Sequence, residues 1–172
     1  QVSLITGLRH MSPGDSPAAK ATAFIKRFAA ALGVSHLEVR ETTKSKKQTV
    51  VHFDQVHEGL KVVDRSATIT FDKAGFIRAF NNDCGRIDAV QAARIGRDEA
   101  VELALASLSQ GANESFPLVG EPVVKEALIV GGKVATQLFE VHASRKPLAE
   151  HLVIRVDAHA GQGVGIHNAV IH

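Results

Sequence analysis

The apolar residues of this chain change their spacing twice in the same order, and this limits the folds available to it. In the first segment they recur every three to four positions, at Ala21, Phe24, Ile25, Phe28 and Leu32. This is the spacing of an amphipathic helix. Ser16 before Pro17 is a favourable helix start, and Gly33 follows the last apolar residue as a helix stop. The sequence therefore predicts a helix over residues 17–32.

Strands follow this helix, because apolar and polar residues now alternate. Val51 and Phe53 fall on one face, and residues 57–59 supply a turn. Further along, Ala67, Ile69 and Phe71 alternate with Ser66, Thr68 and Thr70. Residues 72–75 then form a predicted hairpin turn, with a glycine at its left-handed position. An antiparallel meander is the expected result.

The second half repeats the order of helix and then strands. Asp98 and Glu99 suit the first turn of a helix, because carboxylates there oppose the positive end of the helix dipole. Three strand candidates follow, with paired glycines at 131–132 as a tight turn: Val123–Val130, Lys133–Ala143 and His151–Asp157. Helices segregated from antiparallel strands define an α+β fold.

We expect two subdomains, each built from one helix packed on an antiparallel β-sheet. The polar stretch NNDCGRID, residues 81–88, interrupts the pattern between them. The expected organisation is, in order, an N-terminal extension at 1–17, a first subdomain at 18–82, a linker at 83–94, a second subdomain at 95–168 and a C-terminal tail at 169–172.

Composition excludes several classes of function. Apolar residues make up 45% of the 172 residues and charged residues 22%, which is typical of a globular protein. No apolar run is long enough for a transmembrane helix, so we expect no membrane partner. A net charge of +2, with no Trp or Tyr to stack on bases, gives little support to nucleic-acid binding. The single cysteine, Cys84, excludes an internal disulfide and a multi-cysteine zinc site.

Nine histidines raise the question of a metal site. His52 and Asp54 share a predicted strand face and His57 follows within a turn, so three ligands could converge. We favour exposed strand and turn histidines instead, because zinc usually takes four convergent ligands with a supporting shell of hydrogen bonds. The motif H-E-x-x-H is also absent. No metal site is predicted.

Motifs for covalent or phosphate chemistry are weak. No G-x-S-x-G is present to hold a serine nucleophile. Cys84 lies beside Gly85 in a polar segment, where an accessible thiol with a histidine partner is conceivable, although a lone linker cysteine is inert in most proteins. The glycines of AGQGVG, residues 160–165, lack the Lys-Ser/Thr and the helix of a phosphate loop. We therefore predict no catalytic residues and no enzymatic activity.

The first predicted meander, VHFDQVHEGLKVVDRSATITFDKAGFIRAFNND, resembles the propeptides of thermolysin-like and fungalysin-like secreted zinc proteases. The family pattern is an apolar strand, a glutamine, Gly-x-Pro-Val, a further strand and Asp-x-x-Gly. Lys61 stands where proline is usual, and Asp64 stands where glycine is common. The residues at matching places are Phe53, Gln55, Gly59, Val62, Asp72 and Gly75.

The second half resembles the PepSY region that follows in the same propeptides. RDEAVELAL corresponds to its opening helix, QLFEVHA to its central strand and VIRVDAHAGQGV to its closing hairpin, with Ala160 in place of a threonine. In that hairpin Asp157 can accept hydrogen bonds from turn amides and Gly161 tolerates a positive φ, which makes His159 a turn residue rather than a ligand. The predicted structural turn residues are Gln55, Gly59, Asp72, Gly75, Asp157 and Gly161.

The resemblance implies an FTP-like subdomain followed by a PepSY-like, or cystatin-like, subdomain. Such a propeptide acts as an intramolecular chaperone and inhibitor of a cognate secreted zinc metalloprotease. Its partner is then the protease catalytic domain, which carries the zinc, and no cofactor is expected in this chain. The chain is expected to be secreted or periplasmic, after removal of a signal peptide that it does not contain. The alternative is a free-standing PepSY-type protease inhibitor or ligand-binding module.

The resemblance also places the last residues of the chain near the start of a mature protease. Val170 or Ile171 could then occupy an apolar specificity pocket, and an imidazole or the terminal carboxylate could approach the protease zinc. The alternative is a mobile end with no inhibitory role. The predicted inhibitory residues are His167, Asn168, Ala169, Val170, Ile171 and His172.

Overall fold

Strands make up most of this α+β protein, and two helices accompany them in the part of the chain that the structure describes. The structure is a computed structural model and describes residues 4–33, 36–110, 119–145 and 150–169. The chain divides into two compact units, Gln1–Ile87 and Asp88–His172. No helix in the described ranges is long and apolar enough to cross a membrane.

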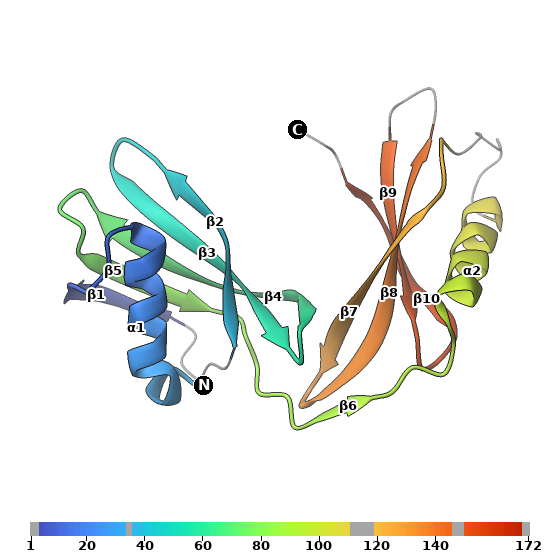
Figure 1. The fold of residues 1–172 in the computed structure, drawn as a ribbon, viewed down its shortest axis with the longest axis horizontal. Helices are drawn as coiled ribbons and strands as arrows, with labels where there is room; N and C mark the ends of the chain where they lie inside the picture. Colours follow the sequence, from blue (N-terminus) through green and yellow to red (C-terminus); the bar gives the residue numbers. More distant parts are fainter. Residues whose placement is uncertain (1–3, 34–35, 111–118, 146–149, 170–172) are drawn as a thin grey trace. The chain divides into compact units, whose positions relative to one another are not determined.

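The first unit is an antiparallel sheet with one helix across a face (Figure 1). Along the sheet the strands follow the order β1-β5-β4-β3-β2. The elements of this unit are β1 (Leu4–His10), α1 (Pro17–Leu32), β2 (Leu37–Lys44), β3 (Gln48–His57), β4 (Leu60–Asp72) and β5 (Ile77–Asn82).

Both ends of α1 are capped by the residues that the sequence suggested. The Ser16 side chain accepts a hydrogen bond from the Ala19 N–H at 3.1 Å, and Pro17 occupies the first helical turn. Gly33 has a φ of 66°, in the left-handed region, and its N–H bonds back to the carbonyls of the last turn. Such a cap satisfies backbone groups that have no partner inside the helix.

The core of the first unit lies between α1 and the sheet. From the helix, Ala21, Phe24, Ile25 and Leu32 are buried. From the sheet, the alternation in β4 buries the predicted apolar set, and β3 and β5 add the remaining members: Val51, Phe53, Ala67, Ile69, Phe71, Ile77 and Phe80. Burying each of the larger side chains stabilises the fold by about 1.5–3 kcal/mol.

The second unit has the same composition of one helix on an antiparallel sheet, with strand order β7-β8-β9-β10. A short strand, β6, runs parallel to the start of β8. Its elements are β6 (Ala89–Gln91), α2 (Arg97–Gln110), β7 (Val123–Gly131), β8 (Val134–Arg145), β9 (Glu150–Asp157) and β10 (Gln162–Ala169). The core joins Ala100, Ala104 and Leu108 of α2 to Phe139, Val141, Ala143, Leu152, Ile154, Val156 and Ala158.

Some strands lie where the sequence predicted none. The predicted N-terminal extension contains β1, and the predicted linker contains β6. In β1 the pairing register shifts between Thr6 and His10, with Gly7 at a φ of 72°, so the strand has no regular alternation. Three residues in β6 are too few to show a period. In addition, β10 extends to Ala169, one residue into the predicted tail.

Candidate functional site

The β4–β5 turn is held by one carboxylate. Oδ1 of Asp72 accepts hydrogen bonds from the N–H groups of Ala74 and Phe76, each at 3.0 Å. The Gly75 N–H donates to the Asp72 carbonyl at 3.0 Å, and Gly75 has a φ of 82°. A side chain there would be strained, because L-residues rarely adopt this region. Asp72 and Gly75 are therefore turn-forming residues.

The β9–β10 turn repeats this arrangement in the second unit. Oδ1 of Asp157 accepts from the N–H groups of His159 and Ala160, each at 2.8 Å. Gly161 has a φ of 66° and donates its N–H to the Asp157 carbonyl at 2.9 Å. His159 Nδ1 lies 3.1 Å from the Ala92 carbonyl oxygen, so this imidazole ties the turn to the segment after β6. The geometry gives His159 a structural contact.

Gln55 has a role that the sequence did not reveal. It lies inside β3 rather than in a turn, and it is 1% exposed. Its Nε2 donates to the Gly85 carbonyl at 2.6 Å, and its Oε1 accepts from the Gly85 N–H at 3.0 Å. One amide side chain thus satisfies both backbone groups of a residue 30 positions away. The predicted turn role of Gln55 is therefore wrong: its side chain instead binds the backbone of the segment after β5, an interaction that we call the clasp on Gly85.

The turn between β3 and β4 contains two consecutive residues with positive φ. Glu58 has a φ of 51° and Gly59 a φ of 81°. His57 pairs with Leu60 across the turn. Two central residues with positive φ match the twist of a tight hairpin, and glycine is preferred there.

Cys84 is fully buried in the core of the first unit. Burial, together with a smaller contribution from the nearby Asp83 carboxylate, raises the pKa of its thiol to about 12. The Cys84 N–H donates to Oδ1 of Asn82 at 3.0 Å, so the segment turns inward at this point. A thiolate is the reactive form of cysteine, and this environment disfavours it. The alternative of an accessible, reactive thiol is wrong.

The three residues considered as metal ligands have other partners or surroundings. His52 Nε2 lies 3.3 Å from the Thr43 hydroxyl. The Asp54 carboxylate forms ion pairs with Arg40 at 3.2 Å and with Lys61 at 2.9 Å. His57 lines a separate cavity beside the β3–β4 turn. Within the described residues, no three His, Cys, Asp or Glu side chains converge in a way that could hold a metal ion.

A histidine pair that the sequence gave no sign of lies on β8 and β9. His142 Nδ1 and His151 Nε2 are 3.0 Å apart, so an N–H of one ring donates a hydrogen bond to a nitrogen of the other. Desolvation lowers the pKa of His142, and the positive charge of Lys125 lowers it further. His142 Nε2 is buried with no hydrogen-bond partner. The lowered pKa favours the neutral form of the His142 ring.

The predicted inhibitory tail lies partly in the sheet. The backbones of His167, Asn168 and Ala169 belong to β10 and pair with Val153, Leu152 and His151 of β9. Val170, Ile171 and His172 lie outside the described residues. An inhibitory role for these residues remains a prediction.

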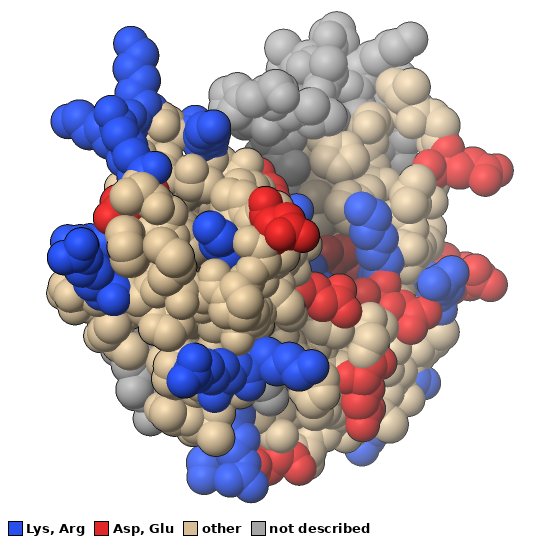
Figure 2. Space-filling model, turned by 60° about the vertical axis from the view of Figure 1, so that its left-hand side comes forward, with Lys and Arg blue, Asp and Glu red and all other residues tan. Residues whose placement is uncertain are grey.

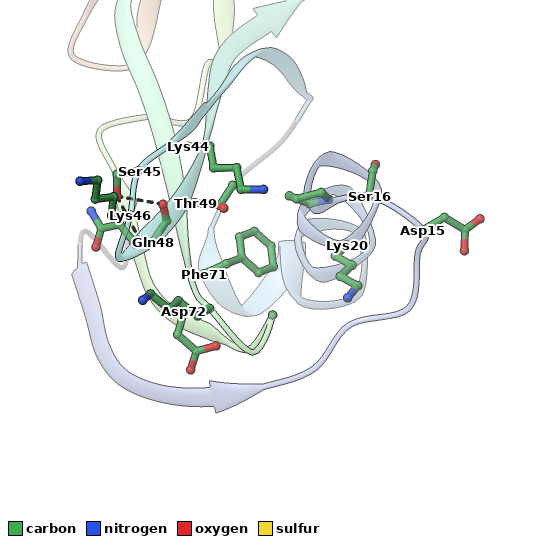
Figure 3. Close-up of a pocket in the computed structure, with 13 residues that line it drawn as sticks. Asp15, Ser16, Lys20, Lys44, Ser45, Lys46, Gln48, Thr49, Phe71 and Asp72 are labelled. Carbon is green, nitrogen blue, oxygen red and sulfur yellow. Dashed lines mark hydrogen bonds between the residues drawn. The ribbon is translucent and has the colours of Figure 1, made fainter.

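The first unit also carries a cavity of about 460 Å³ beside the start of α1. Its walls come from the start of α1, the β2–β3 turn and the β4–β5 turn, and Figure 3 shows Phe71 at its centre. Lysines line it from each of these segments: Lys20, Lys44, Lys46 and Lys73. On the face shown in Figure 2, lysine and arginine side chains project at several places, with aspartate and glutamate side chains among them.

Comparison with known proteins supports part of the resemblance seen in the sequence. Residues 32–84 match the model of the family described as Fungalysin/Thermolysin Propeptide Motif. This range contains the β3–β4 and β4–β5 turns and Gln55. No curated protein matches the chain.

Among solved structures, the chain is similar to the Bacillus megaterium YpeB C-terminal domain. The two share 13% sequence identity with a TM-score of 0.47, over 98% of this chain and 72% of the other. The PepSY-like character of the second half remains a prediction. The similarity to the fungalysin/thermolysin propeptide family therefore covers one part of the chain, residues 32–84.

Proposed function

We propose that this chain is the propeptide of a secreted zinc metalloprotease precursor, and that it both assists folding of the catalytic domain and inhibits it. The observation that carries the proposal is the propeptide motif at residues 32–84. In the structure this motif is the central part of a packed unit, in which Gln55, Asp72 and Gly75 fix the backbone.

Both activities follow from one complementary surface. A surface that binds the native protease and not its unfolded chain stabilises the native state by RT ln(1 + [L]/Kd), which is about 2.7 kcal/mol at a hundredfold excess over Kd. The same surface excludes substrate if it covers the active-site cleft. An interface of about 1,600 Å² is typical of protease–inhibitor complexes, and these include some of the tightest complexes known.

The zinc and the catalytic groups belong, in this proposal, to the partner. The chain supplies no nucleophile of its own at Cys84, because burial keeps that thiol protonated. A propeptide needs only to bind the catalytic domain, to stabilise its native fold and to cover its active-site cleft.

The test first reads the gene beyond this segment, and a metalloprotease domain encoded in the same reading frame is the partner used. That domain is unfolded in denaturant and diluted out with and without the chain, and recovered peptidase activity is measured. Active, separately prepared protease is titrated with the chain in a second experiment. We expect a higher yield in the first and saturable inhibition in the second. No effect in either experiment overturns the proposal. The absence of any protease domain in the reading frame favours the free-standing inhibitor or ligand-binding module instead.

A further inference from the structure

The lysine-lined cavity of the first unit offers a surface suited to a charged partner. Three segments that are distant in sequence meet there: the start of α1, the β2–β3 turn and the β4–β5 turn. Phe71, 2% exposed, forms an apolar floor. The full lining is Asp15, Ser16, Pro17, Lys20, Lys44, Ser45, Lys46, Gln48, Thr49, Phe71, Asp72, Lys73 and Gly75.

The four lysines of this cavity are not neutralised by the protein. Among the described residues, none of their ammonium groups forms an ion pair, whereas Lys61 and Lys133 elsewhere each do. Lys20 is half-buried, and its Nζ lies 3.4 Å from the position that a Cβ on Gly75 would occupy. In Figure 3, Lys44 extends toward α1 above Phe71.

Two carboxylates border the cavity, those of Asp15 and Asp72, and within the described part of the chain neither forms an ion pair with one of the four lysines. Oδ1 of Asp72 is already occupied by two turn amides. In Figure 3 the carboxylate of Asp15 is directed away from Phe71, beyond α1. The first turn of α1 has no acidic residue, so the positive end of its dipole adds to the field of the lysines.

Unpaired ammonium groups around an apolar floor favour an anionic guest. Opposite charges attract each other more strongly near a protein surface than in bulk water, because the effective dielectric constant is lower there. The lining contains lysines and no arginine. Lysine ammonium groups act as point charges that attract carboxylate and phosphate alike, without the planar fork of arginine. The apolar floor also gives the methylene groups of an acidic side chain something to contact.

We infer that this cavity binds the carboxylate side chains of an acidic segment on a protein partner. The inference rests on the proposed function in one respect, because the partner is taken to be the protease catalytic domain. It adds the location on this chain, the chemistry of the contact and the residues that make it, with Lys20 and Lys44 as the principal contacts.

The first experiment measures the cavity alone, with no protease present. The probe is a fluorescein-labelled hexapeptide of glutamate, with a hexapeptide of glutamine as its control, and binding is followed by fluorescence anisotropy at low salt. We expect saturable binding of the glutamate peptide only. The Lys20→Gln/Lys44→Gln double variant should weaken this binding at least tenfold.

The matched control is the Lys26→Gln/Lys47→Gln variant. It removes the same charge from the same helix and the same hairpin, at residues that do not line the cavity. Equal weakening by both variants would show that net charge and not the cavity is responsible, and would overturn the inference. So would failure of the glutamate peptide to bind, or displacement of it by inorganic phosphate at equal concentration. Thermal unfolding of each variant shows whether it is folded.

The second experiment separates this inference from the proposed function. Inhibition of the protease by the chain is compared for the wild type and the two double variants. Loss of inhibition in the cavity variant alone supports the inference. Unchanged inhibition in that variant overturns it and leaves the proposed function intact. If the glutamate peptide binds the cavity but the chain neither inhibits nor refolds the protease, the proposed function fails and the carboxylate site stands.

Discussion

Replacing Gln55 by leucine tests whether the clasp on Gly85 holds the first unit together. Leucine has a similar size, so the change removes the amide while leaving little empty space. The Gly85 N–H and carbonyl, now bonded at 3.0 and 2.6 Å, both lose their partner. An unsatisfied buried backbone group costs about 1–3 kcal/mol. Gly85 is only half-buried, so the lower part of that range applies to each group.

We therefore expect Gln55→Leu to destabilise the protein by about 2–3 kcal/mol, for two groups at the lower part of that range. Urea unfolding followed by circular dichroism should show a midpoint lower by about 1–3 M, for a slope of about 1–2 kcal/mol/M. Hydrogen exchange at the Gly85 amide should also become faster, and the free energy of opening derived from it should decrease by a similar amount. This would locate the effect at Gly85.

The matched control is Gln48→Leu, at the exposed start of the same strand. An exposed substitution usually changes stability by no more than about 0.5 kcal/mol. A loss below about 1 kcal/mol in Gln55→Leu, or unchanged exchange at Gly85, would refute the reasoning that this side chain fixes the segment after β5.

Three further predictions follow from the site. At pH 8 the thiol of Cys84 should be essentially unreactive toward a disulfide reagent in the folded protein, because a pKa of about 12 leaves roughly one thiolate in 10⁴. The raised pKa also means that the stability of the fold decreases as the pH rises above 9.0, the ordinary pKa of the thiol, and Cys84→Ala should not show this decrease. The lowered pKa of His142 means that stability is lost as pH falls below 6.5, because the unfolded chain takes up the proton first; melting temperatures at pH 7.5 and 5.5 should differ less in His142→Gln, and an equal difference would contradict the assignment. Removal of residues 170–172 should weaken inhibition of the protease while leaving the melting temperature nearly unchanged; the cut follows Ala169 because Asn168 and Ala169 pair with β9, and full inhibition by the shortened chain would show that the folded body alone blocks the protease.

Features that depend on neighbouring residues could be predicted from the sequence. Ser16, Pro17 and Gly33 mark the ends of α1, because a helix cap is a set of hydrogen bonds within a few residues. Asp72 and Asp157 hold their turns through amides two to four residues ahead. The alternation in β4 likewise indicated its buried face, because side chains alternate along any strand.

Features that join distant segments were decided only by the tertiary structure. The polar residues around Cys84 suggested an exposed linker. In the structure the Gln55 side chain binds the backbone of this segment and the Cys84 thiol is buried in the core. Strands β1 and β6 exist because β5 and β8 supply their hydrogen-bond partners, and neither strand has a pattern of its own.

The candidate site divides in the same way. The sequence by itself determined the turns, the helix caps and the order of residues that resembles a propeptide, because each is a property of adjacent residues. The cavity with its four lysines, and the pairing of His142 with His151, required strands and turns to be brought together from across a unit. The position of a charged side chain in space depends on how distant segments fold together. For this reason only the tertiary structure could show that Lys20 and Lys44 line one cavity.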